Sequence, residues 1–254
     1  MAILAICGLV GFCRYYGFGW NDVIKLSFYE NLANPSIRIV RIEPGLRKEQ
    51  IASNLAGKLG WGETEIDQFE NAKLAVNILN PEGYYFPKTY MIPRDATPQL
   101  VSSTMFSEYQ KESSTIKKSK STKIINENTA LKVASIIQRE AAGKSDMRLI
   151  SGIVWNRIFK GMNLQIDATL QYVKGDEDNW WPPVSPSDKN LESPYNTYKY
   201  PLPPTPIASP GIDAIAAAYN PQTTSCLFYL HDKNRQIHCS ATYAGHLANI
   251  KKYY

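Results

Sequence analysis

One stretch decides the fold of the first half of the chain: VRIEPGLRKEQIASNLAGKLGW, from Val40 to Trp61. The residues that lead into it from Ile37 predict a short strand, and the Pro-Gly pair within it predicts a turn. After the turn, apolar residues recur at the spacing of one helix face. These residues are Leu46, Ile51, Leu55 and Leu59.

A second helix and a second strand follow this stretch. The helical pattern runs from Glu63 to Leu79 and ends at Asn80-Pro81, because proline cannot continue a helix. The tyrosine-rich segment EGYYFPKTYMIP, Glu82 to Pro93, predicts a strand and a turn. The order strand, helix, helix, strand has the size of a small carbohydrate-binding repeat of the LysM type. We therefore expect a LysM-like subdomain over residues 36–93.

The N-terminus is apolar and then aromatic. About 13 apolar or small residues precede Arg14, and the rings of Tyr15, Tyr16, Phe18 and Trp20 follow. A helix needs about 20 apolar residues to cross a bilayer, so the run is short for a full span. A truncated membrane anchor, the core of a signal peptide and a buried helix are all compatible with it. The aromatic residues favour the membrane interface, so we expect a membrane anchor over residues 1–20.

The rest of the chain, residues 94–254, predicts a larger mixed domain, and the fold class is therefore α+β. Asn128 or Thr129 is expected to cap a helix that starts at Ala130. A long proline-rich loop from Trp180 to Gly211 is of the kind that commonly carries function. The expected helices span Thr97 to Ser107, Ala130 to Ala142, Ser145 to Lys160, a short piece after Asp167, Ile212 to Tyr219, and Ala241 to Tyr253, with a hairpin over Cys226 to Ser240.

Charge and motif content exclude several classes of function. The 254 residues carry 28 Lys+Arg and 23 Asp+Glu, a net charge of +5 that is spread along the chain. A nucleic-acid binder usually gathers its basic residues on one face or arm, so we expect no nucleic-acid partner. The one Lys/Ser-rich stretch, Lys111 to Lys123, predicts a solvated helix extension or loop. No glycine-rich phosphate loop and no G-x-S-x-G motif supports nucleotide or acyl-transfer chemistry.

Two cysteines of the predicted hairpin could form a disulfide. Cys226 and Cys239 flank a polar turn segment between two strand-like runs. A turn centred between Asp232 and Lys233 would bring the two sulfur atoms face to face, and a turn centred one residue later would not. The sequence leaves the bond open.

The segment VASIIQRE places a carboxylate among apolar residues. Val133, Ile136, Ile137 and Glu140 share one helix face, which sets the glutamate on the buried stripe. Burial disfavours the charged form and raises the pKa toward the range of a general acid at neutral pH. The alternative is that Glu140 turns outward at the helix end and pairs with Lys144.

Further motifs lie around this helix in a fixed order. They are EGYYFPKTY, VASIIQRE, NRIFKGMNLQIDATLQY (Asn156 to Tyr172), SPYNTY (Ser193 to Tyr198) and LPPTPIASPG (Leu202 to Gly211). Together they resemble the endolytic murein transglycosylases, the MltG or YceG-like family. The resemblance implies a single-pass enzyme of the bacterial cytoplasmic membrane that cuts inside nascent peptidoglycan glycan strands on the extracytoplasmic side. It also implies coupling to peptidoglycan synthases, the penicillin-binding proteins, and no cofactor.

The resemblance also implies a mechanism with one glutamate. The family's catalytic residue falls on Glu140, while Gln138 stands where relatives often have a second glutamate. The acid protonates the bond between N-acetylmuramic acid and N-acetylglucosamine. The same group then takes the proton of the muramic 6-hydroxyl, which attacks C1 and leaves a 1,6-anhydro end. The enzyme is thus expected to be a carbon-oxygen lyase.

Candidate substrate-binding residues come from two of these motifs. Amides, hydroxyls and rings at these positions could bind acetamido groups and sugar faces. Asp167 could instead cap the following helix, and Asn156 could be a buried packing amide. Thr205 replaces a glycine that the family usually has, which leaves the contacts of that loop open. The candidates are Gln165, Asp167, Thr169, Tyr195, Asn196, Thr197 and Tyr198.

Two other functions compete with this one. A two-carboxylate muramidase would use Glu140 as the acid and Asp167 as the second group. A non-catalytic wall-binding protein would keep the fold alone. No metal site is expected, because the spacings of His231, His238 and His246 match no ligand pattern. His238 and His246 fall where the family has histidines, so we expect a structural role for them.

Overall fold

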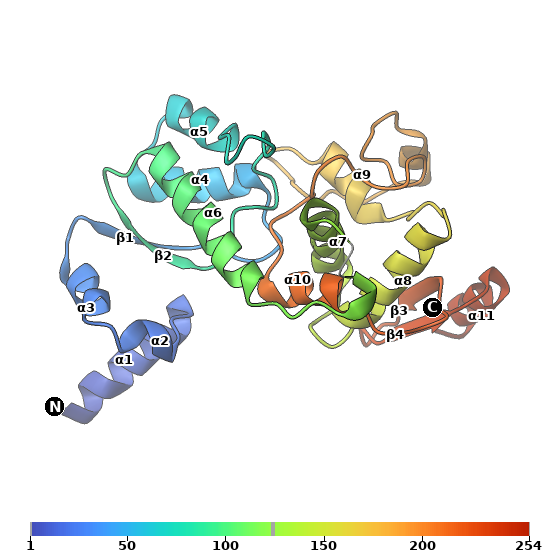
Figure 1. The fold of residues 1–254 in the computed structure, drawn as a ribbon, viewed down its shortest axis with the longest axis horizontal. Helices are drawn as coiled ribbons and strands as arrows, with labels where there is room; N and C mark the ends of the chain where they lie inside the picture. Colours follow the sequence, from blue (N-terminus) through green and yellow to red (C-terminus); the bar gives the residue numbers. More distant parts are fainter. Residues whose placement is uncertain (1, 123–124, 254) are drawn as a thin grey trace. The chain divides into compact units, whose positions relative to one another are not determined.

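The antiparallel pair of β1 (Ile37–Arg41) and β2 (Thr89–Pro93) frames the first half of the chain, with Val40 opposite Tyr90. The computed structural model describes residues 2–122 and 125–253, which form two units, Met1–Tyr109 and Gln110–Tyr254. Two helices, α4 (Lys48–Leu59) and α5 (Glu63–Glu70), lie between the strands in sequence (Figure 1). The predicted order of strand, helix, helix, strand is confirmed.

A common apolar core holds these elements together. The stripe predicted for α4 is buried, and Leu46 packs at its edge. Side chains from both strands and from the segment before β2 complete the core. Its members include Val40, Ile51, Leu55, Leu59, Phe69, Tyr85, Tyr90 and Met105.

The second helix is shorter than predicted. It ends at Glu70, and Asn71 caps it with its side-chain amide on Asp67. Beyond it, Val76 is 100% exposed and Leu79 is also exposed. The prediction of a helix to Leu79 was wrong, because Leu74 packs against the core whereas Val76 and Leu79 are exposed, so no continuous apolar helix face is buried.

Three helices form the N-terminal part of the first unit: α1 (Ala2–Tyr16), α2 (Trp20–Val23) and α3 (Leu26–Ala33). Phe28 of α3 is buried, whereas Trp20 and Leu26 are exposed. Within residues 2–122 and 125–253, no helix is both long enough and apolar enough to cross a membrane.

Helix α6 (Pro98–Ser114) is longer than predicted. The helix buries Val101, Met105 and Tyr109 at successive turns, and this packing extends the helix beyond Ser107. The division between the units therefore falls inside this helix, later than the expected boundary at residue 94. The start of the Lys/Ser-rich stretch continues α6, in line with the predicted helix extension, and η1 (Lys120–Thr122) follows.

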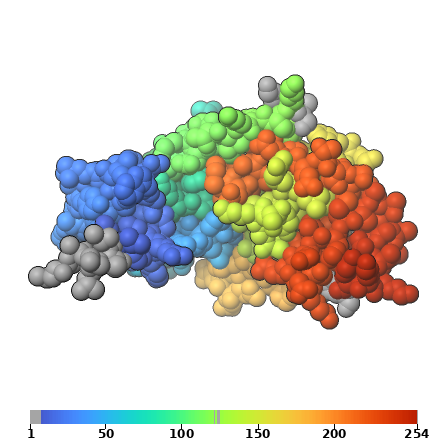
Figure 2. All heavy atoms as spheres, turned by 90° about the horizontal axis from the view of Figure 1, so that it is seen from below, coloured from blue at the N-terminus to red at the C-terminus, as the bar shows by residue number. Residues whose placement is uncertain are grey.

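The second unit is built on helices. Helix α10 packs against α7 and α8, and α11 packs on the β3–β4 hairpin. On the face seen in Figure 2, orange atoms of the α10 region adjoin yellow-green atoms of the α8 region. The mixed α+β class is confirmed. The elements are α7 (Glu127–Glu140), α8 (Met147–Phe159), α9 (Asp167–Lys174), η2 (Pro186–Asn190), α10 (Ile212–Tyr219), β3 (Phe228–His231), β4 (Ile237–Ser240) and α11 (Tyr243–Tyr253).

The start of α7 differs from the prediction. Asn126, not Asn128 or Thr129, is the cap, and its side-chain oxygen accepts from the Thr129 backbone N–H at 2.8 Å. The cap lies earlier because the helix includes Glu127, whose charge suits the positive end of a helix dipole. Helix α7 ends at Glu140, so the candidate acid is its last residue.

Candidate active site

A cavity of about 850 Å³ lies within the second unit. The end of α7, the segment before α9, strand β3 and helix α11 all contribute side chains to it. Both acidic and basic groups line it, so it suits a polar ligand of several functional groups. Its lining is Glu140, Arg157, Met162, Leu164, Gln165, Ile166, Asp167, Lys189, Tyr198, Phe228, Tyr229, Leu230, His231, Tyr243 and His246.

Glu140 sits at one wall of this cavity. Its side chain is half-buried, and the Tyr229 hydroxyl donates a hydrogen bond to its Oε2 at 2.6 Å. Burial raises the pKa of Glu140 and Asp167 adds to the rise, while Tyr229, His231 and the Ala168 backbone N–H oppose it. The outward alternative is excluded in this structure, because Lys144 pairs with Asp213 at 2.6 Å.

The carboxylate of Asp146 holds the loop that follows α7. Asp146 occupies the cap position of α8, but its side chain makes no cap hydrogen bond. Its carboxylate instead accepts from the backbone N–H groups of Ala142 at 2.9 Å and Gly143 at 3.2 Å. The same carboxylate lies 2.7 Å from Nε2 of His231. Asp146 thus ties the end of α7 to strand β3.

The segment before α9 faces the cavity from another side. Gln165 has φ 52°, a left-handed conformation that is uncommon for a residue with a side chain. Its backbone N–H donates to Thr197 O at 2.9 Å, which fixes the segment against the SPYNTY loop. Asp167 does not cap α9, since Ile166 holds that position. It accepts a hydrogen bond from the Tyr198 hydroxyl at 2.6 Å instead.

Three of the predicted substrate-binding residues lie elsewhere. Thr169, Asn196 and Thr197 are fully buried and are not among the residues that line the cavity. The hydroxyls of Thr169 and Thr197 lie 2.9 Å apart, and the Asn196 amide donates to Lys189 O and Leu191 O. Their hydrogen bonds hold the loop in place, so they support the cavity rather than line it.

Tyr195 likewise serves the loop. Its hydroxyl lies 2.7 Å from the Thr205 hydroxyl, and its ring packs on Tyr172. The Thr205 hydroxyl therefore links the LPPTPIASPG loop to the SPYNTY loop. Of the predicted site residues, Glu140, Gln165, Asp167 and Tyr198 are brought together in the cavity.

Arg157 on α8 adds a cation that the sequence did not indicate. Its guanidinium donates to Leu227 O at 2.6 Å and to Leu164 O. Burial lowers its pKa. The side chain thereby ties the segment before β3 to the segment before α9, and it lines the cavity between them.

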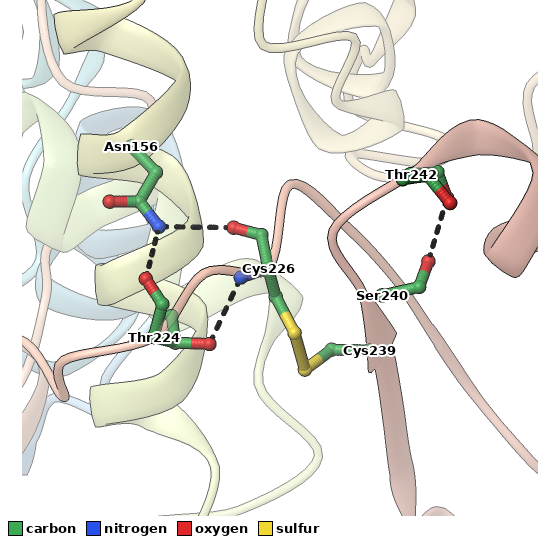
Figure 3. The surroundings of a disulfide bond; sticks show 6 residues. All are labelled: Asn156, Thr224, Cys226, Cys239, Ser240 and Thr242. Carbon is green, nitrogen blue, oxygen red and sulfur yellow. Dashed lines mark hydrogen bonds between the residues drawn. A yellow bond between two sulfur atoms is a disulfide. The ribbon is translucent and has the colours of Figure 1, made fainter.

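The segment before β3 is held by a side-chain amide and a disulfide (Figure 3). Asn156, which is half-buried, donates to Thr224 O at 2.8 Å and Cys226 O at 3.1 Å and so ties α8 to this segment. Cys226 and Cys239 are bonded, with their Cα atoms 5.8 Å apart. Strand pairing sets Tyr229 opposite Cys239, so neither predicted turn centre was right. The bond forms because Cys226 precedes the ladder and is free of its register.

The three histidines have separate roles. His238 lies 2.9 Å from Asp232 and stacks on Tyr253, in keeping with the expected structural role. His246 lines the cavity and stacks on Phe228, and burial lowers its pKa. His231 also lines the cavity.

Tyr229 and His231 were missed as site residues. The sequence signal was the alternation of side chains along a strand: the two residues are two positions apart, so both side chains point to the same face. The sequence could not show which face that was, because it depends on how the hairpin packs within the second unit. Arg157 gave no signal, because an arginine in an apolar helix is usually a surface residue.

Comparison with known proteins gives the chain a place among relatives. Residues 22–252 match the sequence model of the YceG-like family. The endolytic murein transglycosylase of Bacillus subtilis (strain 168) is 32% identical over 190 residues, which cover 74% of this chain and 52% of that protein. The endolytic murein transglycosylase of Streptococcus pneumoniae D39 is 32% identical over 154 residues, 59% of this chain and 28% of that protein.

The chain thus spans about half, or less, of the length of these curated relatives. A crystal structure of a yceG-like protein from Listeria monocytogenes has the same fold, with a TM-score of 0.70 at 24% identity. The match covers 90% of this chain and 80% of that one. On the match over residues 22–252, the chain belongs to the YceG-like family.

Proposed function

We propose that this chain is a peptidoglycan lytic transglycosylase that cleaves inside glycan strands, with Glu140 as its single catalytic acid and base. One observation carries the proposal: a half-buried carboxyl with a raised pKa lies at the wall of a polar cavity of about 850 Å³. The names of the curated relatives supply the substrate class.

The chemistry needs one group that gives a proton and then takes one. Protonated Glu140 donates to the glycosidic oxygen between N-acetylmuramic acid and N-acetylglucosamine, and the bond from that oxygen to C1 breaks. The carboxylate so formed accepts the proton of the muramic 6-hydroxyl while the oxygen of that hydroxyl bonds to C1. The products are a 1,6-anhydro end and a new N-acetylglucosamine hydroxyl, and no water is consumed. The raised pKa keeps the acid protonated nearer to neutral pH.

Substrate contacts follow from the cavity lining. Gln165, Asp167 and Tyr198 face the ligand in this proposal, and their polar groups hold the sugar hydroxyl and acetamido groups. Thr169, Tyr195, Asn196 and Thr197 act by keeping the SPYNTY loop in place. The Asp167 carboxylate, engaged by the Tyr198 hydroxyl at 2.6 Å, orients that ring.

A second candidate function rests on Asp167. It lines the cavity together with Glu140, which a two-carboxylate muramidase would need. Such an enzyme would activate a water molecule and leave a reducing muramic end.

Features of the first unit support the proposed LysM-like region and the proposed attachment to the membrane. We infer that residues 36–93 are LysM-like, on the order β1, α4, α5, β2 with antiparallel strands. The apolar and aromatic residues 1–20 attach the protein to the bacterial cytoplasmic membrane, with the second unit on the extracytoplasmic side. Peptidoglycan synthases are the proposed partners.

Mass spectrometry of the products tests the function. Purified glycan strands are incubated with the wild-type chain and with Glu140→Gln, which keeps the shape and removes the titrating proton. Anhydro-muramic ends with the wild type and none with the variant support the proposal. Reducing ends that disappear in Asp167→Asn favour the muramidase, and intact strands with both proteins favour a wall-binding role.

A further inference from the structure

We propose that Tyr229 of strand β3 is a positioning residue for Glu140, whose carboxyl it holds in place and whose carboxylate it stabilises once the proton has left. The inference rests on the proposed function. It assigns to the hairpin a part in proton transfer, in addition to its part in the cavity wall.

The geometry brings together two groups that lie 89 residues apart in the sequence. Glu140 is the last residue of α7, where a side chain has few helix neighbours to fix its rotamer. The Tyr229 hydroxyl donates to Oε2 at 2.6 Å, a distance typical of a hydroxyl bonded to a carboxyl group. Burial raises the pKa of Tyr229, so its hydroxyl remains a donor through the working range of an enzyme.

Strand β3 is itself fixed on both sides of Tyr229. The Cys226–Cys239 disulfide closes the hairpin, and Arg157 donates to Leu227 O just before the strand. Beyond Tyr229, His231 lies 2.7 Å from Asp146, and its ring meets the Tyr229 ring edge-on. The tyrosine hydroxyl is therefore held by covalent and hydrogen-bonded attachments that do not pass through Glu140.

Other charged and polar groups also face Glu140. From α9 come the Asp167 carboxylate, which raises its pKa, and the Ala168 backbone N–H, which lowers it; from β3 comes His231, which lowers it. Arg139 precedes it on α7, and Arg157 on α8 and Tyr198 in the SPYNTY loop interact with it electrostatically. Among the groups that lower the pKa of Glu140, the Tyr229 hydrogen bond has the largest effect.

This hydrogen bond acts unequally on the two states of Glu140. A hydroxyl that donates to a carboxylate makes a charge-assisted bond, which is stronger than its bond to the neutral acid. The bond therefore tightens as the proton moves to the glycosidic oxygen, and it favours the transition state over the ground state. Removal of the hydroxyl should slow the reaction and, because the carboxylate loses a donor, raise the pKa of Glu140.

Two substitutions at position 229 change the donor in opposite directions. Tyr229→Phe removes it, and we expect kcat to fall about 10- to 100-fold with little change in KM. The alkaline limb of the pH profile of kcat should move up by about 1 pH unit, because the active acid stays protonated to higher pH. Replacement of Tyr229 by 3-fluorotyrosine, a stronger donor, should move the same limb to lower pH.

Tyr85→Phe is the matched control. It removes another buried tyrosine hydroxyl, which donates to Phe69 O at 2.5 Å in the first unit. It should leave the pH profile unchanged, and thermal unfolding of each variant reports any loss of stability.

A direct titration of Glu140 separates this inference from the proposed function. The carboxyl band in infrared difference spectra between wild type and Glu140→Gln gives the midpoint without any substrate. A midpoint that is higher in Tyr229→Phe, together with the shifted kcat profile, supports the inference. An unchanged midpoint, or a shifted midpoint with an unshifted kcat profile, overturns it. Absence of glycan cleavage by the wild type would overturn the proposed function, whereas the midpoint would still decide whether Tyr229 controls the Glu140 proton.

Discussion

Each unit of this protein has a glutamate whose pKa is raised by burial, and the two carboxyl groups have different surroundings. Glu82 in the first unit is 0% exposed and lies against the start of α4, where the Lys48 backbone N–H donates to its Oε2 at 3.4 Å. Burial raises its pKa to about 8, and Glu49 adds to the rise. Glu140 in the second unit also has a raised pKa, but it lines a cavity.

The difference teaches that a raised pKa does not by itself make an acid catalyst. Both carboxyl groups have a raised pKa, but Glu140, unlike Glu82, lines a cavity with room for a sugar. Glu82 is enclosed by its own unit, so its proton affects stability. Access to a ligand separates the two roles.

The largest expected effect is on glycan cleavage. Glu140→Gln should lower the cleavage rate by at least about 100-fold, because general acid and base catalysis are both lost. Glu82→Gln should leave the rate per folded molecule within a few-fold of wild type. Release of soluble fragments from purified glycan strands measures both variants. An equal loss in the two variants would erase the contrast between the two glutamates.

The next effect concerns the stability of the first unit and tests the structural role of Glu82. Glu82 has a pKa of about 8 in the folded state against 4.5 for a free side chain, so between these pH values the folded state binds a proton that the unfolded state releases. The free energy of unfolding should therefore fall as pH rises through this range, by on the order of 4 kcal/mol from this group.

Denaturant unfolding of the first unit at pH 5 and pH 8 measures this dependence. Glu82→Gln should remove most of the slope, while Glu140→Gln, a change in the other unit, should retain it. A first unit whose slope is the same in wild type and Glu82→Gln would contradict the burial argument.

The disulfide gives an effect of about 3 kcal/mol on the second unit alone. Cys226 and Cys239 close a loop with a sequence separation of 13, and a loop of this size corresponds to about 3 kcal/mol in the chain-entropy account. The double variant Cys226→Ser, Cys239→Ser should lose this stability and, since β3 carries Tyr229, should also cleave more slowly. Cys13→Ala, at a free cysteine of the first unit, is the control. Equal stability of the double variant and wild type would show that the hydrogen bonds of Asn156 and Arg157 suffice.

Two glycines provide the smallest effects, of opposite sign. A Cβ at Gly152 in α8 would lie 2.2 Å from the backbone oxygen of Gln222, so Gly152→Ala should destabilise the second unit by about 1–3 kcal/mol. At Gly57 in α4, no atom lies within 4 Å of such a Cβ, and Gly57→Ala should stabilise the first unit by about 0.5–1 kcal/mol. Thermal unfolding of the two variants checks the signs. A stabilised Gly152→Ala would mean that the segment after α10 can move away.

Much of the fold could be predicted from local patterns. The apolar stripes of α4 and α7 and the proline and glycine punctuation gave the element order, because these signals act within one or two helical turns. The end of α5 could not be predicted, since whether Leu79 is buried depends on where the core stops. The division between the units inside α6 could not be predicted either, because it depends on how Met105 and Tyr109 pack in the folded chain.

Part of the candidate site could be predicted, since Glu140, Gln165, Asp167 and Tyr198 line the cavity. Glu140 stands on an apolar stripe, and that pattern is visible in sequence. Thr169, Asn196 and Thr197 carry hydroxyl and amide groups, as Tyr198 and Gln165 do, and only the folded structure shows which of these residues face the cavity. Glu82 gave no sequence signal, because its burial comes from residues distant in the chain.

The most direct test of this account is a crystal structure of Glu140→Gln with a bound glycan fragment of alternating N-acetylglucosamine and N-acetylmuramic acid. The account predicts that the fragment lies in the cavity of the second unit, with a glycosidic oxygen about 3 Å from the side chain at position 140. The residue there should retain its hydrogen bond to Tyr229. A fragment bound in the second unit with its glycosidic oxygens far from position 140 would contradict the assignment of Glu140 as the acid.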